Sequence, residues 1–210
     1  MILPVHSLLG FLIVVLIVTF MPGPAMLYCA QQGTKHGHKT ALLASIGVEF
    51  GVFILVLAAV FGLSIILASS KMLFLVIQVI GALYLIYLGI KSIVGFYVAH
   101  HKSAKIVKGH SIFIKGMLIN LTNPKVIVFL AALLPQFVYP HKPHAFLALL
   151  ILGVFYNFMG VVVNVTVGQI AAFTHRNAIA GSPSFFQRIF SSWGIGIVFI
   201  ILGIVMLLTH

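Results

Sequence analysis

Hydrophobic residues along the chain form six long runs, separated by short segments that carry most of the lysine, arginine and histidine. The runs cover residues 8–21, 41–69, 72–99, 116–139, 145–173 and 193–208. About 20 apolar residues in a helix, each rising about 1.5 Å, span the hydrocarbon core of a bilayer. The first run needs the residues before it to reach this length. The pattern therefore predicts an all-α integral membrane protein with six transmembrane helices.

The composition excludes a soluble globule. Of 210 residues, 62% are hydrophobic and 6% are charged, and the mean hydropathy is +1.24, whereas soluble domains carry about 25% charged residues. The formal net charge of +11 resides mainly in loops, which argues against nucleic-acid binding. One cysteine, Cys29, excludes an internal disulfide. We expect a single transmembrane domain over 1–210, and the sequence leaves open whether the chain forms a homo-oligomer.

The distribution of lysine and arginine predicts the orientation. With six spans, seven basic residues fall opposite the N-terminus: Lys35, Lys39, Lys102, Lys105, Lys108, Arg176 and Arg188. Two fall on the N-terminal side, Lys71 and Lys142. Because cytoplasmic loops carry the excess of basic residues, both termini are predicted to lie outside, in the periplasm if the membrane is a bacterial inner membrane.

The basic loop at 100–112 divides the chain into two three-helix repeats, 1–99 and 113–210. An odd number of spans per repeat gives the repeats opposite orientations, as in many secondary transporters. The first helix of each repeat contains a proline break, at Pro22-Gly23-Pro24 and at Asn123-Pro124. The predicted fold is thus a 3+3 inverted repeat with broken first and fourth helices.

Each proline break also resembles the start of a new helix. Proline removes a backbone donor and disrupts the preceding turn, but it suits the first helical position, and Asn123 suits the N-cap before Pro124. A helix start presents unpaired N–H groups and the positive end of the helix dipole. Two such ends close together would suit the carboxylate of a small amphoteric solute. Simple structural kinks are the alternative.

Two ionisable residues fall inside the spans. Glu49, the only acid of the chain, follows Lys39 by ten residues, and Lys125 follows Lys115 by ten. Ten helical residues rise about 15 Å, half of the hydrocarbon thickness, so both charges are predicted near mid-depth. Charges at this depth are costly and are candidates for function. Alternatively, a protonated or lysine-paired Glu49 merely holds two helices together.

Amides add to this candidate site. Asn157 and Asn164, seven residues apart, lie on one side of the fifth helix, and Asn120 precedes the second break. An amide facing lipid is costly, so these side chains are expected to face the bundle interior. Hydrogen bonding between helices explains them as well as contact with a solute does.

Residues 120–137 carry a family resemblance, in the run NLTNPKVIVFLAALLPQF. This run resembles the fourth span of LysE/RhtB amino-acid exporters, close to the homoserine and threonine exporters. The Pro22-Gly23-Pro24 break, the Gly47/Gly51 pair and the stretch 81–89 agree in order and spacing. The resemblance covers nearly the whole chain and implies proton-driven efflux of amino acids. It carries site roles over to Pro22, Pro24, Asn120, Asn123, Pro124 and Lys125.

This chain departs from the family pattern at Glu49, where relatives often have a neutral residue. Some relatives also carry an acid in span five, where this chain has Gly160. These departures bear on the proton-coupling residue and on the identity of the substrate.

The leading hypothesis is a proton-coupled exporter of a small neutral amino acid such as homoserine or threonine. Helix N-termini and Lys125 would hold the carboxylate, and Glu49 would alternate between a proton and the substrate ammonium. The predicted binding residues are Pro22, Gly23, Pro24, Glu49, Asn120, Asn123, Pro124, Lys125 and Asn157. Its expected partners are the solute, protons and the lipid bilayer.

Two other functions are weighed against amino-acid export. The first is export of a metal cation or of another small metabolite, and the cation is disfavoured by one acid without intramembrane histidine. A membrane enzyme or a non-transporting scaffold is disfavoured because no catalytic constellation is apparent at membrane depth. No cofactor and no metal site are predicted.

Overall fold

The computed structural model describes residues 5–69, 71–93, 109–138 and 144–176, together with 197, 200–201, 203–205 and 207–208. This described part of the chain is helical, with no strand. Its elements are α1 (Val5–Phe20), α2 (Pro24–His36), α3 (His38–Ser69), α4 (Lys71–Ile93), α5 (Gly109–Leu121), α6 (Pro124–Val128), the π-helical turn η1 (Phe129–Leu133), the 3₁₀ turn η2 (Leu134–Phe137) and α7 (Ala145–Arg176). Because α5 begins at Gly109, residues 109–112 of the predicted basic loop are helical.

Two helices are long and apolar enough to cross a membrane, in the segments His38–Gly62 and Ala145–Phe173. Two further candidates are bent pairs, Leu8–Phe20 with Pro24–His36 and His110–Leu121 with Pro124–Phe137, each bent by 48°. The breaks predicted in the first and fourth helices are therefore confirmed. The described residues give two to four candidate spans. Six spans and the inverted repeat stay predictions, and half of the residues in 193–208 lie outside the described part of the chain.

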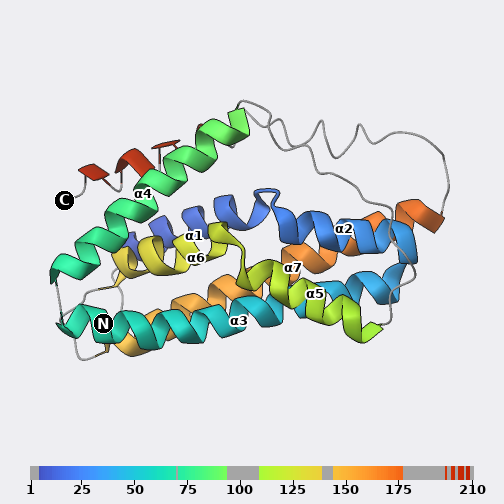
Figure 1. The fold of residues 1–210 in the computed structure, drawn as a ribbon, viewed down its shortest axis with the longest axis horizontal. Helices are drawn as coiled ribbons and strands as arrows, with labels where there is room; N and C mark the ends of the chain where they lie inside the picture. The colour runs from blue at the N-terminus through green and yellow to red at the C-terminus, as the bar shows by residue number, and fades with distance from the viewer. Residues whose placement is uncertain are drawn as a thin grey trace.

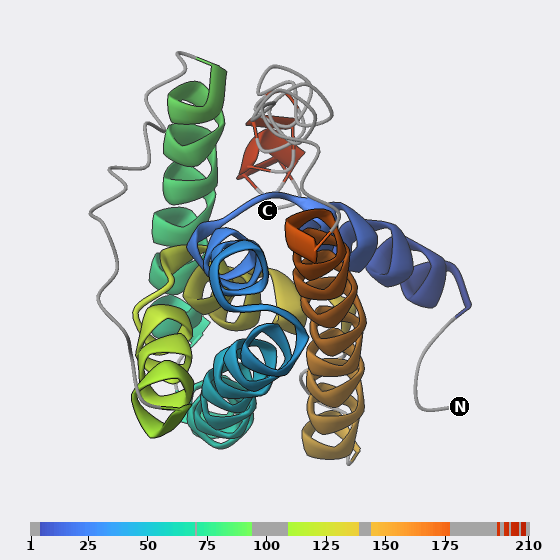
Figure 2. The ribbon, with the colours of Figure 1, turned by 90° about the vertical axis from the view of Figure 1, so that its right-hand side faces the viewer.

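The broken pairs, α3 and α7 run along the long axis of the molecule, whereas α4 leans across one end (Figure 1). Helix α3 packs against α5 and α7, and α2 packs against α7 and α3. Figure 2, which looks along the bundle, shows α2, α3, α5 and α7 clustered, with α4 on one side. Gly37 alone separates α2 from α3 and has a positive φ of 82°, a conformation that glycine adopts readily.

Apolar side chains cover the outside of this bundle as well as its interior. Phe158 and Phe173 are each 60% exposed, and large aliphatic residues of α1, α3 and α4 are exposed in the same way. Exposed apolar surface of this extent is unusual for a soluble monomer. It suits contact with lipid.

Two apolar clusters form the interior. The larger includes Phe11, Phe129 and Leu149, and the smaller includes Tyr28 and Val48. Helix α3 contributes to both clusters, through Val52 to the first and Val48 to the second. Between these two valines lies Glu49, so the only acidic residue is positioned where the clusters meet.

Glycines bring backbones into direct contact between α3 and α5. A Cβ on Gly47 would collide with the carbonyl oxygen of Phe113, and one on Gly116 would lie 2.8 Å from the carbonyl oxygen of Ala44. A third contact joins α2 to α7, where a Cβ on Gly33 would collide with the carbonyl oxygen of Gly168. Small residues allow such approaches between membrane helices.

We expect Gly47→Ala to destabilise the protein, because overpacking at a rigid contact costs about 1–3 kcal/mol. The melting temperature in detergent should fall by several degrees, at roughly 2–4 °C per kcal/mol for a chain of this size. Gly62→Ala is the matched control on α3, since a Cβ there meets no atom within 4 Å. Equal melting temperatures for the two variants would contradict a close backbone contact between Gly47 and Phe113.

Candidate substrate-binding site

The first helix break places the start of α2 in the middle of the bundle. Helix α1 ends at Phe20, and α2 begins at Pro24 with Gly23 as its extended N-cap, which contributes no side-chain hydrogen bond. Proline at the first helical position lacks an N–H that would otherwise be unpaired. The next residues, Ala25 and Met26, line a small pocket. The predicted helix start is therefore present and borders a cavity.

The second break is closed by its own side chains. Asn123 is the N-cap of α6, and its side-chain oxygen accepts a hydrogen bond from the Lys125 N–H at 3.1 Å. Its amide nitrogen donates to Asn120 Oδ1 at 3.0 Å, and Asn120 Nδ2 donates to the Val48 carbonyl at 3.1 Å. The predicted N-cap at Asn123 is confirmed. The expectation that both helix starts offer free N–H groups is wrong here, because Lys125 donates to the Asn123 side chain and Val126 and Ile127 donate to its carbonyl.

Lys125 joins the two breaks. Its ammonium donates to the carbonyl oxygens of Val18 and Met21, both at 3.0 Å. These carbonyls lie at the C-terminal end of α1, where a cation is favoured by the helix dipole. The ammonium also lies next to Gly23, 3.5 Å from the position of a Cβ on that residue. Lys125 thus supplies the donors that the chain loses at the first break.

Glu49 is buried, at 4% exposure, and is bound by amides of α7. Asn164 Nδ2 donates to Oε1 at 2.6 Å, and Asn157 Nδ2 donates to Oε2 at 2.9 Å and to the Glu49 carbonyl at 3.0 Å. Hydrogen bonds to a charged group are worth about 1.5–3 kcal/mol. Both carboxylate oxygens therefore have a donor, as a buried carboxylate requires.

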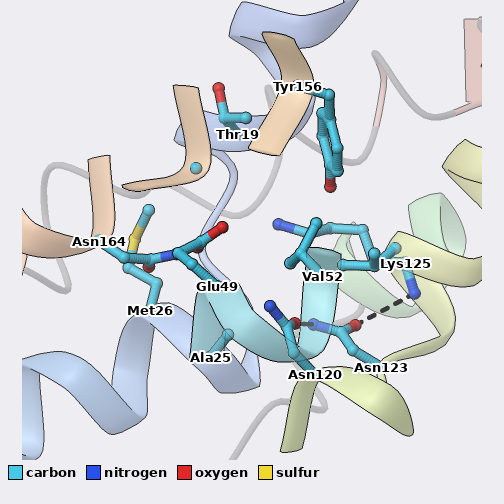
Figure 3. A pocket seen from close by; sticks show the side chains of 12 residues that line it. Thr19, Ala25, Met26, Glu49, Val52, Asn120, Asn123, Lys125, Tyr156 and Asn164 are labelled. Atoms are coloured by element: carbon cyan, nitrogen blue, oxygen red, sulfur yellow. Dashed lines mark hydrogen bonds between the residues drawn. The ribbon is translucent and has the colours of Figure 1, made fainter. Parts of the chain in front are cut away.

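The two charged side chains face each other across one pocket. Figure 3 shows the Lys125 side chain and the Glu49 carboxylate pointing toward each other, with the Tyr156 ring beside them. Tyr156 stacks on Phe129, with ring centroids 4.1 Å apart. The pocket is lined by Thr19, Ala25, Met26, Glu49, Val52, Asn120, Asn123, Lys125, Val126, Tyr156, Gly160 and Asn164.

The pocket is small in this conformation. Its volume is about 30 Å³, enough for about two water molecules, whereas small-molecule pockets measure about 300–1,000 Å³. A ligand of amino-acid size would therefore enter only after the surrounding helices separate.

The structure brings the residues predicted from the sequence together, in three roles. Glu49, Asn120, Asn123 and Lys125 line the pocket. Asn157 binds Glu49 from α7. The remaining four form the breaks: Pro22, Gly23, Pro24 and Pro124. Whether these residues bind a substrate stays a prediction.

Several pocket residues were missing from the predicted set. Asn164 could have been included, because it lies two helical turns from Asn157 on the same face. Gly160 stood out in the sequence only as a departure from the family pattern. No sequence pattern marks the other missing residues as part of a site: Thr19, Ala25, Met26, Val52, Val126 and Tyr156. Within the described residues, no group of three His, Cys, Asp or Glu side chains gathers to hold a metal ion.

Apolar helices that are broken at mid-length around a buried pair of charges are typical of membrane transport proteins. Comparison with known proteins agrees, because the LysE type translocator family matches residues 16–210. The chain belongs to this family and is a multi-pass membrane translocator, not an enzyme.

Individual relatives are similar over about two thirds of the chain. An uncharacterised membrane protein of Vibrio cholerae is 32% identical over 146 residues, covering 67% of this chain and 69% of the relative. Leucine efflux proteins of Salmonella choleraesuis and Salmonella typhimurium are 30% identical over 145 residues, covering 68% of each chain. No solved structure matches.

Proposed function

We propose that this translocator exports small zwitterionic amino acids, which bind between Glu49 and Lys125. The observation that carries the proposal is the placement of one negative and one positive side chain on facing walls of one buried pocket. An α-amino acid carries the same two charges at its ends. Its ammonium would face Glu49, and its carboxylate would face Lys125.

Free hydrogen-bonding capacity supports this arrangement. An ammonium has three donors, and Val18 and Met21 use two of those on Lys125. The first turn of α2 adds N–H groups on the same pocket wall. On the opposite wall, the buried Asn164 Oδ1 has no hydrogen-bond partner in the described part of the chain. It would accept a hydrogen bond from the substrate ammonium.

The family resemblance of residues 120–137 implies homoserine or threonine as substrate, whereas the names of the Salmonella relatives suggest leucine. The pocket wall contains Met26, Val52 and Val126 beside polar groups. This wall is compatible with an aliphatic side chain. We therefore propose a small neutral amino acid and treat leucine, homoserine and threonine as the candidates to be compared.

The single acid of the chain supports proton antiport as part of this proposal. Glu49 is the only aspartate or glutamate of the chain, and it lies in the proposed ammonium site. A carboxylate that binds either a proton or the substrate ammonium couples the two fluxes, because each ligand displaces the other. The proton would bind from the outside as the amino acid leaves.

The orientation belongs to the same proposal. The end of α2, the starts of α3 and α5 and the end of α7 lie at one end of the bundle (Figure 1), and they carry Lys35, Lys39, His110 and Arg176. We place this end on the cytoplasmic side of a bacterial inner membrane, with both termini outside.

A fusion of alkaline phosphatase to the C-terminus should be active. If that fusion is inactive, and a cytoplasmic reporter fused to the same terminus is active, the orientation is the reverse of the one proposed.

The test of export uses the purified full chain in liposomes. Labelled leucine, homoserine and threonine are loaded in parallel, and efflux is followed with and without an inward proton gradient. We expect at least one of the three to leave faster than from empty liposomes, with acceleration by the gradient. If none of the three is transported and a metal ion crosses the same vesicles, the substrate is a cation and the proposal of amino-acid export is wrong.

A further inference from the structure

Three residues on one face of α7 surround the Glu49 carboxylate. Asn157, Gly160 and Asn164 are spaced three and four residues apart, which aligns them on a helix. The two asparagines donate to the two carboxylate oxygens. Between them, Gly160 has no side chain to separate the carboxylate from the helix backbone.

The space at Gly160 is filled by Glu49 itself. A Cβ on Gly160 would lie 2.6 Å from Oε2 and 3.0 Å from both Cδ and Oε1. Carbon and oxygen atoms in van der Waals contact lie farther apart than this, so a methyl group and the carboxylate cannot occupy these positions together. The glycine is what lets the carboxylate lie flat against α7, within reach of both amides.

We infer that Gly160 is a positioning residue that holds Glu49 against α7 and apart from Lys125; the inference rests on the proposed function. Opposite charges attract strongly in a low-dielectric interior. A carboxylate released from α7 would turn toward the Lys125 ammonium, which faces it across the pocket. That ion pair would occupy both groups that a zwitterion needs. Gly160 therefore keeps the site open to a ligand that carries both charges.

A plain packing role for Gly160 is the competing explanation, since small residues are common where membrane helices touch. The chain offers a matched control on the same helix. A Cβ on Gly153 would lie 2.7 Å from Val56 Cγ1, so Gly153 also packs closely against α3. Gly153 does not line the pocket. Gly160→Ala and Gly153→Ala thus add the same methyl group to the same helix interface, in the site and away from it.

The first measurement is the affinity for the transported amino acid in liposomes, at a temperature where both variants are folded. We expect Gly160→Ala to weaken affinity about tenfold or more, the effect of losing one hydrogen bond to a charged group. Gly153→Ala should stay within about twofold of the unmodified protein, less than about 0.5 kcal/mol, because the added methyl group meets Val56, which does not line the pocket. Equal affinities for the two variants would overturn the positioning role.

The second measurement does not depend on transport. Because Glu49 is the only acidic side chain, carbon-13 labelling of glutamate places one side-chain carboxyl signal in the infrared spectrum. In the substrate-free protein, Gly160→Ala should shift the Glu49 band as the carboxylate exchanges amide donors for an ammonium. Gly153→Ala should leave the band unchanged. An unshifted band in Gly160→Ala would overturn the inference even if transport is reduced.

Shortening the acid tests the contact directly. Glu49→Asp alone draws the carboxylate away from the α7 amides, and we expect weaker affinity. In the double variant Glu49→Asp with Gly160→Ala, the methyl group no longer meets the carboxylate, so the affinity should be no lower than that of Glu49→Asp alone. Additive losses would contradict direct contact between the two residues.

The two proposals fail in different ways. A shifted Glu49 band in a protein that transports no amino acid would overturn the proposed function and leave the positioning role intact. Amino-acid transport that depends on Glu49, combined with identical behaviour of Gly160→Ala and Gly153→Ala, would overturn the positioning role alone.

Discussion

Glu49→Gln is expected to remove proton-driven efflux and to weaken substrate binding at least about tenfold, since a hydrogen bond to a charged group is lost. Glutamine has the same shape but cannot exchange a proton. It also presents an NH₂ group where the Asn157 and Asn164 amides converge as donors. Two donors then face each other on one side of the pocket. Efflux from liposomes with and without a proton gradient measures both effects.

Ser45→Ala serves as the control for loss of a buried hydrogen bond on the same helix. Ser45 lies one turn before Glu49 and donates to the carbonyls of Ala41 and Asn164. Its removal deletes a neutral hydrogen bond, worth about 1 kcal/mol, and leaves both charges in place. Gradient-driven acceleration should persist in this variant. If Glu49→Gln kept the same acceleration, Glu49 would not be the coupling residue.

Lys125→Met is expected to reduce both stability and substrate affinity. Methionine keeps an unbranched, extended side chain without the charge, so the Val18 and Met21 carbonyls lose their donor at the first break. An unpaired buried carbonyl costs about 1–3 kcal/mol, which should lower the melting temperature by several degrees. The proposed partner of the substrate carboxylate is lost at the same time, so affinity should fall about tenfold or more.

The matched control is Lys115→Met on α5. Lys115 is exposed and lies 5.8 Å from the centre of the Tyr28 ring, an arrangement worth about 0.5–1 kcal/mol at an exposed site. Binding should therefore change little in Lys115→Met. Unchanged substrate affinity in folded Lys125→Met would leave this lysine with the structural role alone.

The helix breaks could be predicted from the sequence because their causes are local. Proline favours the first helical position, and residues such as Gly23 and Asn123 favour the N-cap before it, so Pro24 and Pro124 mark helix starts within a few residues of sequence. The ten-residue spacing from flanking lysines likewise predicted Glu49 and Lys125 at similar depth, and both line one pocket.

The partners of these two charges depend on tertiary packing and could not be predicted. Lys125 turns back to carbonyls more than 100 positions earlier in the chain, and no sequence pattern marks those carbonyls as acceptors. Gly160 presents a similar case. A glycine in a membrane helix is common, and its role depends on which side chain of α3 lies against it.

Cys29 is buried where α2, α3 and α7 pack together. Nearby, the backbones of α2 and α7 come close at Gly33 and Gly168. The residue is fully buried, and its carbonyl oxygen lies 3.5 Å from the position of a Cβ on Gly168. A thiol in such a place reacts only in the fraction of time when the helices part, much as amide exchange reports local opening. The rate at which a maleimide labels the unmodified protein, relative to its rate on the unfolded chain, therefore measures how often this half of the bundle opens. We expect labelling to quicken during substrate turnover, and a rate unaffected by substrate would mean that this contact stays closed throughout the cycle.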